Sequence, residues 1–321
     1  MLEVAAPAAS RERLGLSFRS ACEQFALRCN SRNLSTGTMG WYRQILGGFG
    51  RFLAEQCEIL AMKEITPGHI RGYLSEERRR GISSETIHRT YGGLRCFFKF
   101  LKRDGLLERN PMELVERPRR ERHLIKPMSL EQVRALLDQA DPGSLLGLRN
   151  RAMMLLMLDS GLRLSEVLGL RLSQLDLEGG EVIVLGKGRK ERRVPIADLM
   201  RRTLKAYLQK RVQVRGGQEL LFVSQSGRRL TGRHIQLTVH RYGLRAGLTG
   251  VRVSPHTLRH TFATQYIRNG GDPFSLQAIL GHSTLEMVRN YVNLGSRDVA
   301  LQHGKFSPMD RLLSPPIGAA P

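Results

Sequence analysis

The first third of the chain spaces its apolar residues three and four positions apart, which is the period of amphipathic α-helices. Thr66 before Pro67, and Ser83 or Ser84 before Glu85, suit helix starts because a hydroxyl accepts a hydrogen bond from a free N–H of the first turn. The pattern predicts a bundle of about four helices over residues 16–115. The four segments read SFRSACEQFALRC, GWYRQILGGFGRFLAEQ, ITPGHIRGYLSEERRR and SSETIHRTYGGLRCFFKFLKRDG.

The second half of the chain mixes helical and strand-like periods. Residues 147–161 predict a buried helix, and a short helix follows from Arg163. EVIVL (181–185) and ERRVPI (191–196) predict two strands around the glycine-rich turn GKGRK, and LFVS (221–224) predicts another short strand. Most of the remaining residues have helical spacing. We therefore expect a mainly α protein: an N-terminal helical bundle and a mixed α/β domain with a small antiparallel sheet.

Turn residues and charges divide the chain into five segments. Ser129 and Gln132 match a capping box, in which the first residues of a helix bond each other, and so mark the start of a second domain. The predicted segments are a flexible N-terminus (1–15), the helical domain (16–115), a basic linker (116–127), the second domain (128–297) and a C-terminal tail (298–321).

Positive charge dominates the composition. The chain carries 51 Lys and Arg residues against 29 Asp and Glu residues, a net charge of +22 with a pI near 10.9. An excess of this size favours a polyanion as partner, and nucleic acid first. The linker concentrates basic residues, which leaves two interpretations open: a solvated connection, or a segment lying along a DNA backbone. These residues are Arg117, Arg119, Arg120, Arg122 and Lys126.

Several classes of protein do not fit the sequence. No apolar run approaches the roughly 18 residues that span a bilayer, and the N-terminus lacks a basic start followed by an apolar stretch. Cys22, Cys29, Cys57 and Cys96 form no Cys-x-x-Cys pair, so we expect reduced, mostly buried thiols and no structural zinc. No basic amphipathic helix dominates, which makes a membrane surface the lesser alternative. We expect a cytoplasmic protein without a membrane partner.

The segment SPHTLRHT contains residue types suited to binding a phosphate. Ser254 as N-cap and Pro255 as first helical residue begin a helix whose free N–H groups favour an anion, and His256 and Arg259 project from its first turn. His256 and His260 share a helical face, as in zinc helices, but the glutamate of the His-Glu-x-x-His pattern and a third ligand are missing. We predict a phosphate site without metal, with His260 packed beside it.

Four other segments complete a set with this helix: SGLRLSEVLGL, VLGKGRKERRVP, LGHS and VRNYVNL. Each alone is weak, because such residues usually lie in solvated turns, helix ends or cores. Together, with HxLRHTFAT, they resemble the tyrosine recombinase (phage integrase) family. The resemblance covers residues 125–295, and more loosely 16–115, where it implies the family's SAM-like core-binding domain. The active-site residues that it implies are, in order, Arg163, Lys187, His256, Arg259, His282 and Tyr291.

The resemblance implies a role for each of these residues in breaking a DNA phosphodiester bond. Tyr291 is the nucleophile, His256 accepts its proton, and Lys187 is the general acid for the departing 5′ oxygen. The two arginines clamp the phosphate oxygens, which planar guanidinium groups suit better than lysines do, and the last histidine bonds a nonbridging oxygen. Ser283 and Glu286 form a second capping box, at the start of the helix expected to carry the nucleophile.

The function implied is site-specific DNA recombination. A 3′-phosphotyrosyl intermediate conserves the phosphodiester energy, so no ATP, metal or other cofactor is expected. The resemblance also implies a homotetramer on two sites of double-stranded DNA, exchanging strands through a Holliday junction. A second recombinase or an accessory DNA-bending protein stays open as a further partner. The alternatives are a type IB topoisomerase, a family that lacks the histidine found here at His256, and a non-catalytic DNA-binding protein on the same fold.

Details of the sequence bear on the subgroup. After Tyr291 the chain reads VNL, where chromosome-dimer-resolving members commonly have THV, and this favours a mobile-element recombinase. Gln265 stands where many relatives have a histidine, outside the catalytic set. About fifteen residues precede the first predicted helix, too few for the arm-binding domain of lambda-type integrases, so we expect the two-domain form. The tail is either a frayed end or a segment that docks into a neighbouring protomer.

Overall fold

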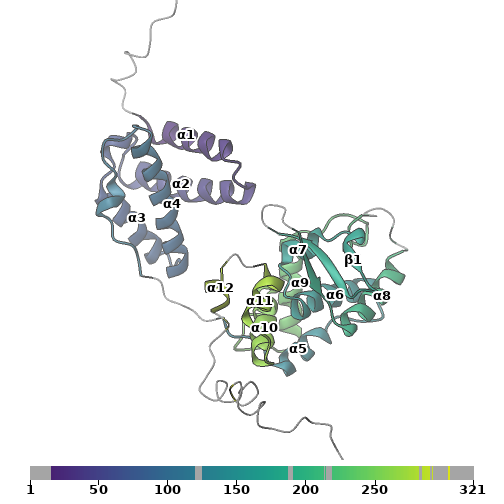
Figure 1. Cartoon of the computed structure of the whole chain (residues 1–321). Helices are drawn as coiled ribbons and strands as arrows, with labels where there is room; N and C mark the ends of the chain where they lie inside the picture. The colour runs from purple at the N-terminus through teal and green to yellow at the C-terminus, as the bar shows by residue number, and fades with distance from the viewer. Residues whose placement is uncertain are drawn as a thin grey trace, which may run out of the picture. The chain divides into compact units, whose positions relative to one another are not determined.

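The computed structural model describes residues 16–119, 125–186, 191–212, 214, 219–281, 284–289, 291 and 303. The chain divides into two compact units, Met1–His123 and Leu124–Pro321, and each has its own apolar core (Figure 1). The fold class that the apolar periods predicted is confirmed: a helical bundle, then a mixed α/β unit with a small antiparallel sheet. Among the described residues, no helix is long and apolar enough to cross a membrane.

The described part of the first unit is a bundle of four α-helices with two 3₁₀ turns between and after them. Each α-helix begins at a serine or threonine whose hydroxyl accepts a hydrogen bond from the first turn, as expected for Thr66 and Ser83. Aromatic rings fill the core, where Phe25, Phe49 and Phe97 meet their neighbours edge to face. The elements are α1 (Phe18–Ser31), α2 (Thr36–Gln56), η1 (Met62–Glu64), α3 (Pro67–Arg79), α4 (Ser84–Arg103) and η2 (Pro111–Leu114).

The second unit combines helices with a sheet of strand order β1-β2-β3, in which both pairs are antiparallel. The predicted capping box is present, since Ser129 and Gln132 bond each other's backbone N–H groups at the start of α5. The elements are α5 (Leu130–Leu137), α6 (Leu145–Asp159), α7 (Leu164–Gly169), η3 (Leu172–Gln174), β1 (Leu175–Asp176), β2 (Glu181–Leu185), β3 (Glu191–Pro195), α8 (Asp198–Arg211), α9 (Gly232–Arg245), α10 (Pro255–Arg268), α11 (Pro273–Leu280) and α12 (Glu286–Arg289).

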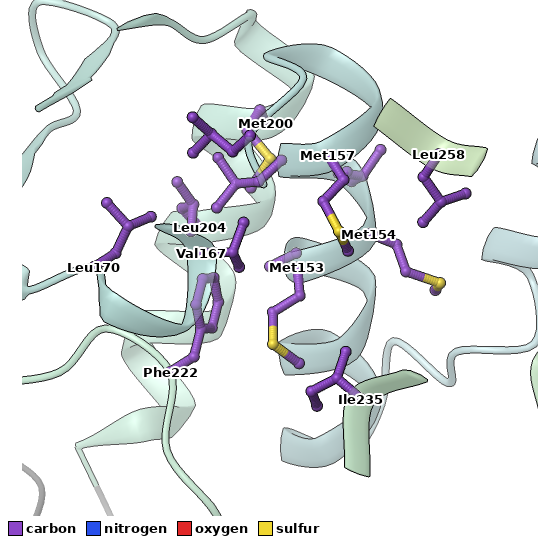
Figure 2. Close-up of a cluster of buried hydrophobic side chains, with 14 of the residues drawn as sticks. Met153, Met154, Met157, Val167, Leu170, Met200, Leu204, Phe222, Ile235 and Leu258 are labelled. Atoms are coloured by element: carbon purple, nitrogen blue, oxygen red, sulfur yellow. The ribbon is translucent and has the colours of Figure 1, made fainter. Parts of the chain in front are cut away.

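Helix α6 is the centre of the second unit. It is buried along most of its length, as its largely apolar sequence predicted, and it packs against both α8 and α10. Three of its methionines contact side chains from α7, α8, α9 and α10 (Figure 2). The core thereby holds α7 and α10, which carry the candidate site, against one buried helix. The methionines are Met153, Met154 and Met157.

Two local predictions need correction, and one strand was missed. LFVS is not a strand of the sheet: Leu220 and Val223 make isolated bridges to Arg171 and Arg229, so no continuous ladder forms. The two-residue strand β1 was not predicted. Tyr291 follows α12 in a turn instead of lying within it, and the capping role of Ser283 lies outside the described residues.

The cysteines are free, but the expectation that they are mostly buried is wrong. Cys29 is buried, Cys22 and Cys57 are half-buried, and Cys96 is exposed. Burial raises the pKa of Cys22 to about 12, so this thiol stays protonated and unreactive.

Candidate active site

Helix α10 begins as its sequence predicts. The Ser254 hydroxyl accepts a hydrogen bond from the Thr257 N–H at 3.2 Å, and Pro255 is the first helical residue. His256 is on the exposed side of the first turn, whereas Arg259 is 5% exposed. The two side chains that the sequence paired therefore have different surroundings, one at the surface and one almost fully buried.

Arg259 is fixed by backbone carbonyl groups from two other segments. Its Nη1 donates to the carbonyl of Gly161, in the turn between α6 and α7, and its Nη2 donates to the carbonyl of Leu280 at 2.9 Å. The last carbonyls of a helix have no partner within the helix, so a guanidinium at the end of α11 satisfies an acceptor that would otherwise need water. Arg259 joins α10, the α6–α7 turn and α11.

The α6–α7 turn requires glycine at position 161. Gly161 has φ +62°, and a Cβ there would lie 2.4 Å from a ring carbon of Phe262 and 2.6 Å from a methyl carbon of Leu280. Glycine alone combines this left-handed backbone with so close an approach. The turn brings the Gly161 carbonyl to Arg259 and places Arg163 at the start of α7.

Arg163 is held by the carboxylate of Glu166. The Arg163 backbone N–H and Nη1 donate to Glu166 at 2.8 and 3.0 Å, and Arg192 from β3 donates to both carboxylate oxygens at 3.0 Å. Burial opposes the charged carboxylate, but the hydrogen bonds and charges of the two arginines outweigh it and hold the pKa of Glu166 below its ordinary value. Glu166 is therefore ionised at neutral pH, and both of its carboxylate oxygens accept hydrogen bonds from arginines.

The site keeps a positive charge at neutral pH. Burial, and then the charge of Arg163, lower the pKa of Arg259 to about 10, which still leaves it protonated. Three guanidinium groups, those of Arg163, Arg192 and Arg259, face one carboxylate, that of Glu166. The cluster therefore has two positive charges to offer to an anion such as a phosphate.

Tyr291 lies beside Arg163 and Arg259. Its half-buried ring packs in the apolar cluster formed by α10, α11 and α12, and its centroid is 5.1 Å from that of His260. Burial raises the pKa of Tyr291, while the charges of Arg259 and Arg163 pull it down. The phenol is neutral at pH 7, and the same arginines stabilise the phenolate that forms when its proton leaves.

Both histidines of α10 have lowered pKa values. Desolvation, then the charges of Arg259 and Arg252, lower the pKa of His256. Desolvation also lowers the pKa of His260, whose hydrogen bond to the backbone of Ile125 works in the opposite direction. His256 is therefore neutral at pH 7 and able to accept a proton. His260 is packed, as the sequence predicted, between the Ile125 backbone and the Tyr291 ring.

The structure brings four of the six predicted site residues together: Arg163, His256, Arg259 and Tyr291, linked by their mutual electrostatic effects. Lys187 and His282 lie outside the described residues, as do Arg120 and Arg122 of the linker and, apart from His303, the tail. The three other basic linker residues are exposed. No group of three or more His, Cys, Asp or Glu side chains within the described ranges could hold a metal ion.

Glu166 and Arg192 were missed by the sequence analysis. Arg192 shares the inward face of β3 with the buried Val194, since alternate strand residues point the same way, and an arginine at an inward position signals a buried partner. Glu166 is three residues after Arg163, the distance of a capping box, but an arginine at the N-cap does not match the usual serine or threonine.

Comparison with known proteins gives the class of this protein: a tyrosine recombinase, an enzyme that cleaves and rejoins DNA. Residues 126–297 match the phage integrase family, and residues 24–105 match the phage integrase N-terminal SAM-like domain. The tyrosine recombinase XerC of Haemophilus influenzae (strain PittEE) is 36% identical over 279 residues, which is 86% of this chain and 93% of the relative. The chain belongs to the phage integrase family of tyrosine recombinases.

Solved structures share the fold. The XerH site-specific recombinase bound to a palindromic difH substrate superposes with a TM-score of 0.70 at 23% identity, over 90% of this chain and 85% of that one. The Tn1549 transposon integrase in complex with transposon right-end DNA gives a TM-score of 0.73 at 19% identity, over 89% and 99% of the two chains.

Proposed function

We propose that this recombinase cleaves double-stranded DNA at a specific site by transesterification at Tyr291. The observation that carries the proposal is that Arg163 and Arg259, far apart in the sequence, both lie close enough to Tyr291 for their charges to oppose the rise in its pKa that burial causes. A phosphate held by these two guanidinium groups would be beside the phenol oxygen. The net charge of +22, and the DNA bound in the XerH and Tn1549 integrase structures, support duplex DNA as the substrate.

The proposed step is a displacement at phosphorus. The Tyr291 oxygen attacks, its proton passes to neutral His256, and the bond to the 5′ oxygen breaks as that oxygen takes a proton from Lys187. A 3′-phosphotyrosyl link and a 5′-hydroxyl result. One phosphate ester replaces another, so a 5′-hydroxyl from a partner strand reverses the step without ATP. The arginines stabilise the charge that builds on phosphorus, and losing one such donor typically costs about 10²–10³ in rate. His282 would bond a nonbridging oxygen.

The organisation that goes with this chemistry is also a proposal. Residues 16–115 form the core-binding domain, residues 128–297 the catalytic domain, and the basic segment 116–127 follows the DNA backbone between them. Four protomers on two sites exchange strands through a Holliday junction, and the tail, residues 298–321, docks into the neighbouring protomer. The exposure of Arg117, Arg119 and Lys126 supports the role of the linker.

Two biological outcomes have support. The VNL sequence after Tyr291 favours rearrangement of a mobile element. The Haemophilus influenzae XerC, which is 36% identical over 86% of this chain, favours resolution of chromosome dimers. Sequencing the DNA junctions that the protein makes in cells distinguishes the two.

The test of the chemistry is Tyr291→Phe. A duplex is selected from random-sequence DNA by binding to the protein, then nicked near its cleavage point so that the covalent adduct cannot religate. We expect Tyr291→Phe to bind this duplex and form no adduct on a denaturing gel. Tyr266→Phe is the matched control, because Tyr266 packs in the same apolar cluster, and it should form adduct normally. An adduct at wild-type level with Tyr291→Phe would overturn the proposal.

A further inference from the structure

Arg192 lies behind the proposed phosphate clamp and connects three elements. Its Nη1 and Nη2 each bond one oxygen of Glu166 at 3.0 Å, and its Nε donates to the carbonyl of Ile279 at 3.0 Å. Its side chain is 14% exposed and that of Glu166 is 7% exposed. The guanidinium therefore joins β3, the first turn of α7 and the last turn of α11 inside the protein.

The end of α11 is built to receive this side chain. Gly281 ends the helix at φ +61°, and a Cβ there would lie 3.0 Å from the guanidinium carbon of Arg192. The carbonyls of Ile279 and Leu280 then bond Arg192 and Arg259 respectively. Two successive carbonyls of one helix end thus align the buried arginine behind the site with the arginine of the clamp.

Glu166 is shared between Arg192 and Arg163. With both carboxylate oxygens bonded to Arg192, the side chain of Arg163 makes one hydrogen bond to Glu166, from Nη1, and remains 39% exposed. A carboxylate without Arg192 would be free to pair with both arms of the Arg163 guanidinium, the geometry that carboxylates prefer. That pairing would neutralise the arginine and turn it away from a phosphate.

We propose that Arg192 is a positioning residue for DNA cleavage: it occupies Glu166 so that Arg163 stays available to the scissile phosphate. Removing Arg192 also lowers the net charge of the four-residue cluster from two positive units to one. The effect falls on the rate of cleavage more than on DNA binding, because most phosphate contacts of a DNA-binding protein lie elsewhere. The inference rests on the proposed function.

The experiment compares Arg192→Gln and Arg192→Lys with Arg193→Gln on the nicked, selected duplex. Arg193 is the next residue of β3 but its side chain is 71% exposed and pairs with Glu181, so it controls for loss of a β3 arginine. We expect Arg192→Gln to slow single-turnover adduct formation by up to about 100-fold, as a misplacement near 1 Å does, with little change in Kd. Arg192→Lys keeps the positive charge but lacks the two parallel N–H donors of a guanidinium, so its rate of adduct formation should lie between those of Arg192→Gln and the wild type.

A double variant separates positioning from mere structural support. If Arg192→Gln slows cleavage because the Glu166 carboxylate has lost its partner and pairs with Arg163, the double variant Glu166→Gln/Arg192→Gln should cleave faster than Arg192→Gln alone. A purely structural role predicts additive or greater loss. A folded Arg192→Gln protein that cleaves at the wild-type rate, or a double variant no faster than the single one, would overturn the inference. Should Arg192→Gln fail to fold, Arg192→Lys and its Glu166→Gln double variant provide the same comparison.

Failure of the proposed function gives a different result. If Tyr291→Phe still forms adduct, the nucleophile is wrong whatever Arg192 does. If Tyr291→Phe abolishes the adduct and Arg192→Gln leaves the rate unchanged, only the role of Arg192 is wrong.

Discussion

Gly161→Ala is expected to destabilise the second unit and to slow cleavage. A non-glycine residue in the left-handed region costs about 1–2 kcal/mol, and overpacking a dense core costs about 1–3 kcal/mol more. Both costs apply at Gly161, where φ is +62° and a Cβ would lie 2.4 Å from Phe262. The variant should therefore lose about 2–5 kcal/mol of unfolding free energy.

Gly247→Ala is the matched control in the same unit. Gly247 has φ +64° but nothing within 4 Å of an added Cβ, so only the backbone cost of about 1–2 kcal/mol applies. In a domain of this size each kcal/mol lowers Tm by about 2–4 °C, so Gly161→Ala should melt roughly 2–12 °C below Gly247→Ala. Thermal unfolding followed by circular dichroism measures the difference.

Activity provides the second readout for this pair. Because the Gly161 carbonyl bonds Arg259, a displaced turn moves a guanidinium of the clamp, and Gly161→Ala should form adduct more slowly at temperatures where it is folded. A Cβ at Gly247 would meet none of the site residues, so its variant should cleave normally. Equal melting temperatures for the two variants would refute the close approach at Gly161 and the argument built on it.

Two further predictions concern pH and salt. Burial and neighbouring arginines lower the pKa of His256, so its neutral, proton-accepting form persists as pH falls past the ordinary histidine value of about 6.5. Single-turnover cleavage by the Tyr291 nucleophile should therefore decline only when the pH falls below about 6.5. The free energy of unfolding should fall over the same range, because the histidine of the unfolded chain binds a proton before that of the folded protein does. A midpoint of the cleavage profile above about 6.5 would contradict the lowered pKa. Neutralising Arg119, Arg120 and Arg122 together should weaken binding to all duplexes and reduce the log–log salt slope by about 0.9 for each DNA phosphate that these arginines no longer neutralise. An unchanged slope would mean that these arginines face solvent.

Local features of the sequence were enough to predict most of the helices. Thr66, Ser83, Ser129 and Ser254 all cap helices where expected, because a cap depends on side chains within three residues of the helix start. The apolar run of residues 152–158 in α6 likewise predicted a helix buried on most sides. The strand predicted at residues 221–224 was wrong because a strand depends on contacts that are not local. Its apolar residues suit a strand, but a strand also needs a neighbouring strand to pair with along its length, and sequence pattern alone does not show whether one is there.

The motifs of the sequence determined the family and the identity of the proposed site residues. Each motif is recognised by the residues on either side of the site position, and the motifs follow one another in a fixed order along the chain. The tertiary structure alone decided how those residues are held. Gly161 and Leu280 reach Arg259 across long separations in the chain, and Arg192 reaches Glu166 from another element. Such contacts leave only a weak trace in sequence, the inward position of an arginine on a strand, because burying a guanidinium becomes favourable only once the fold brings it a carboxylate and unpaired helix carbonyls.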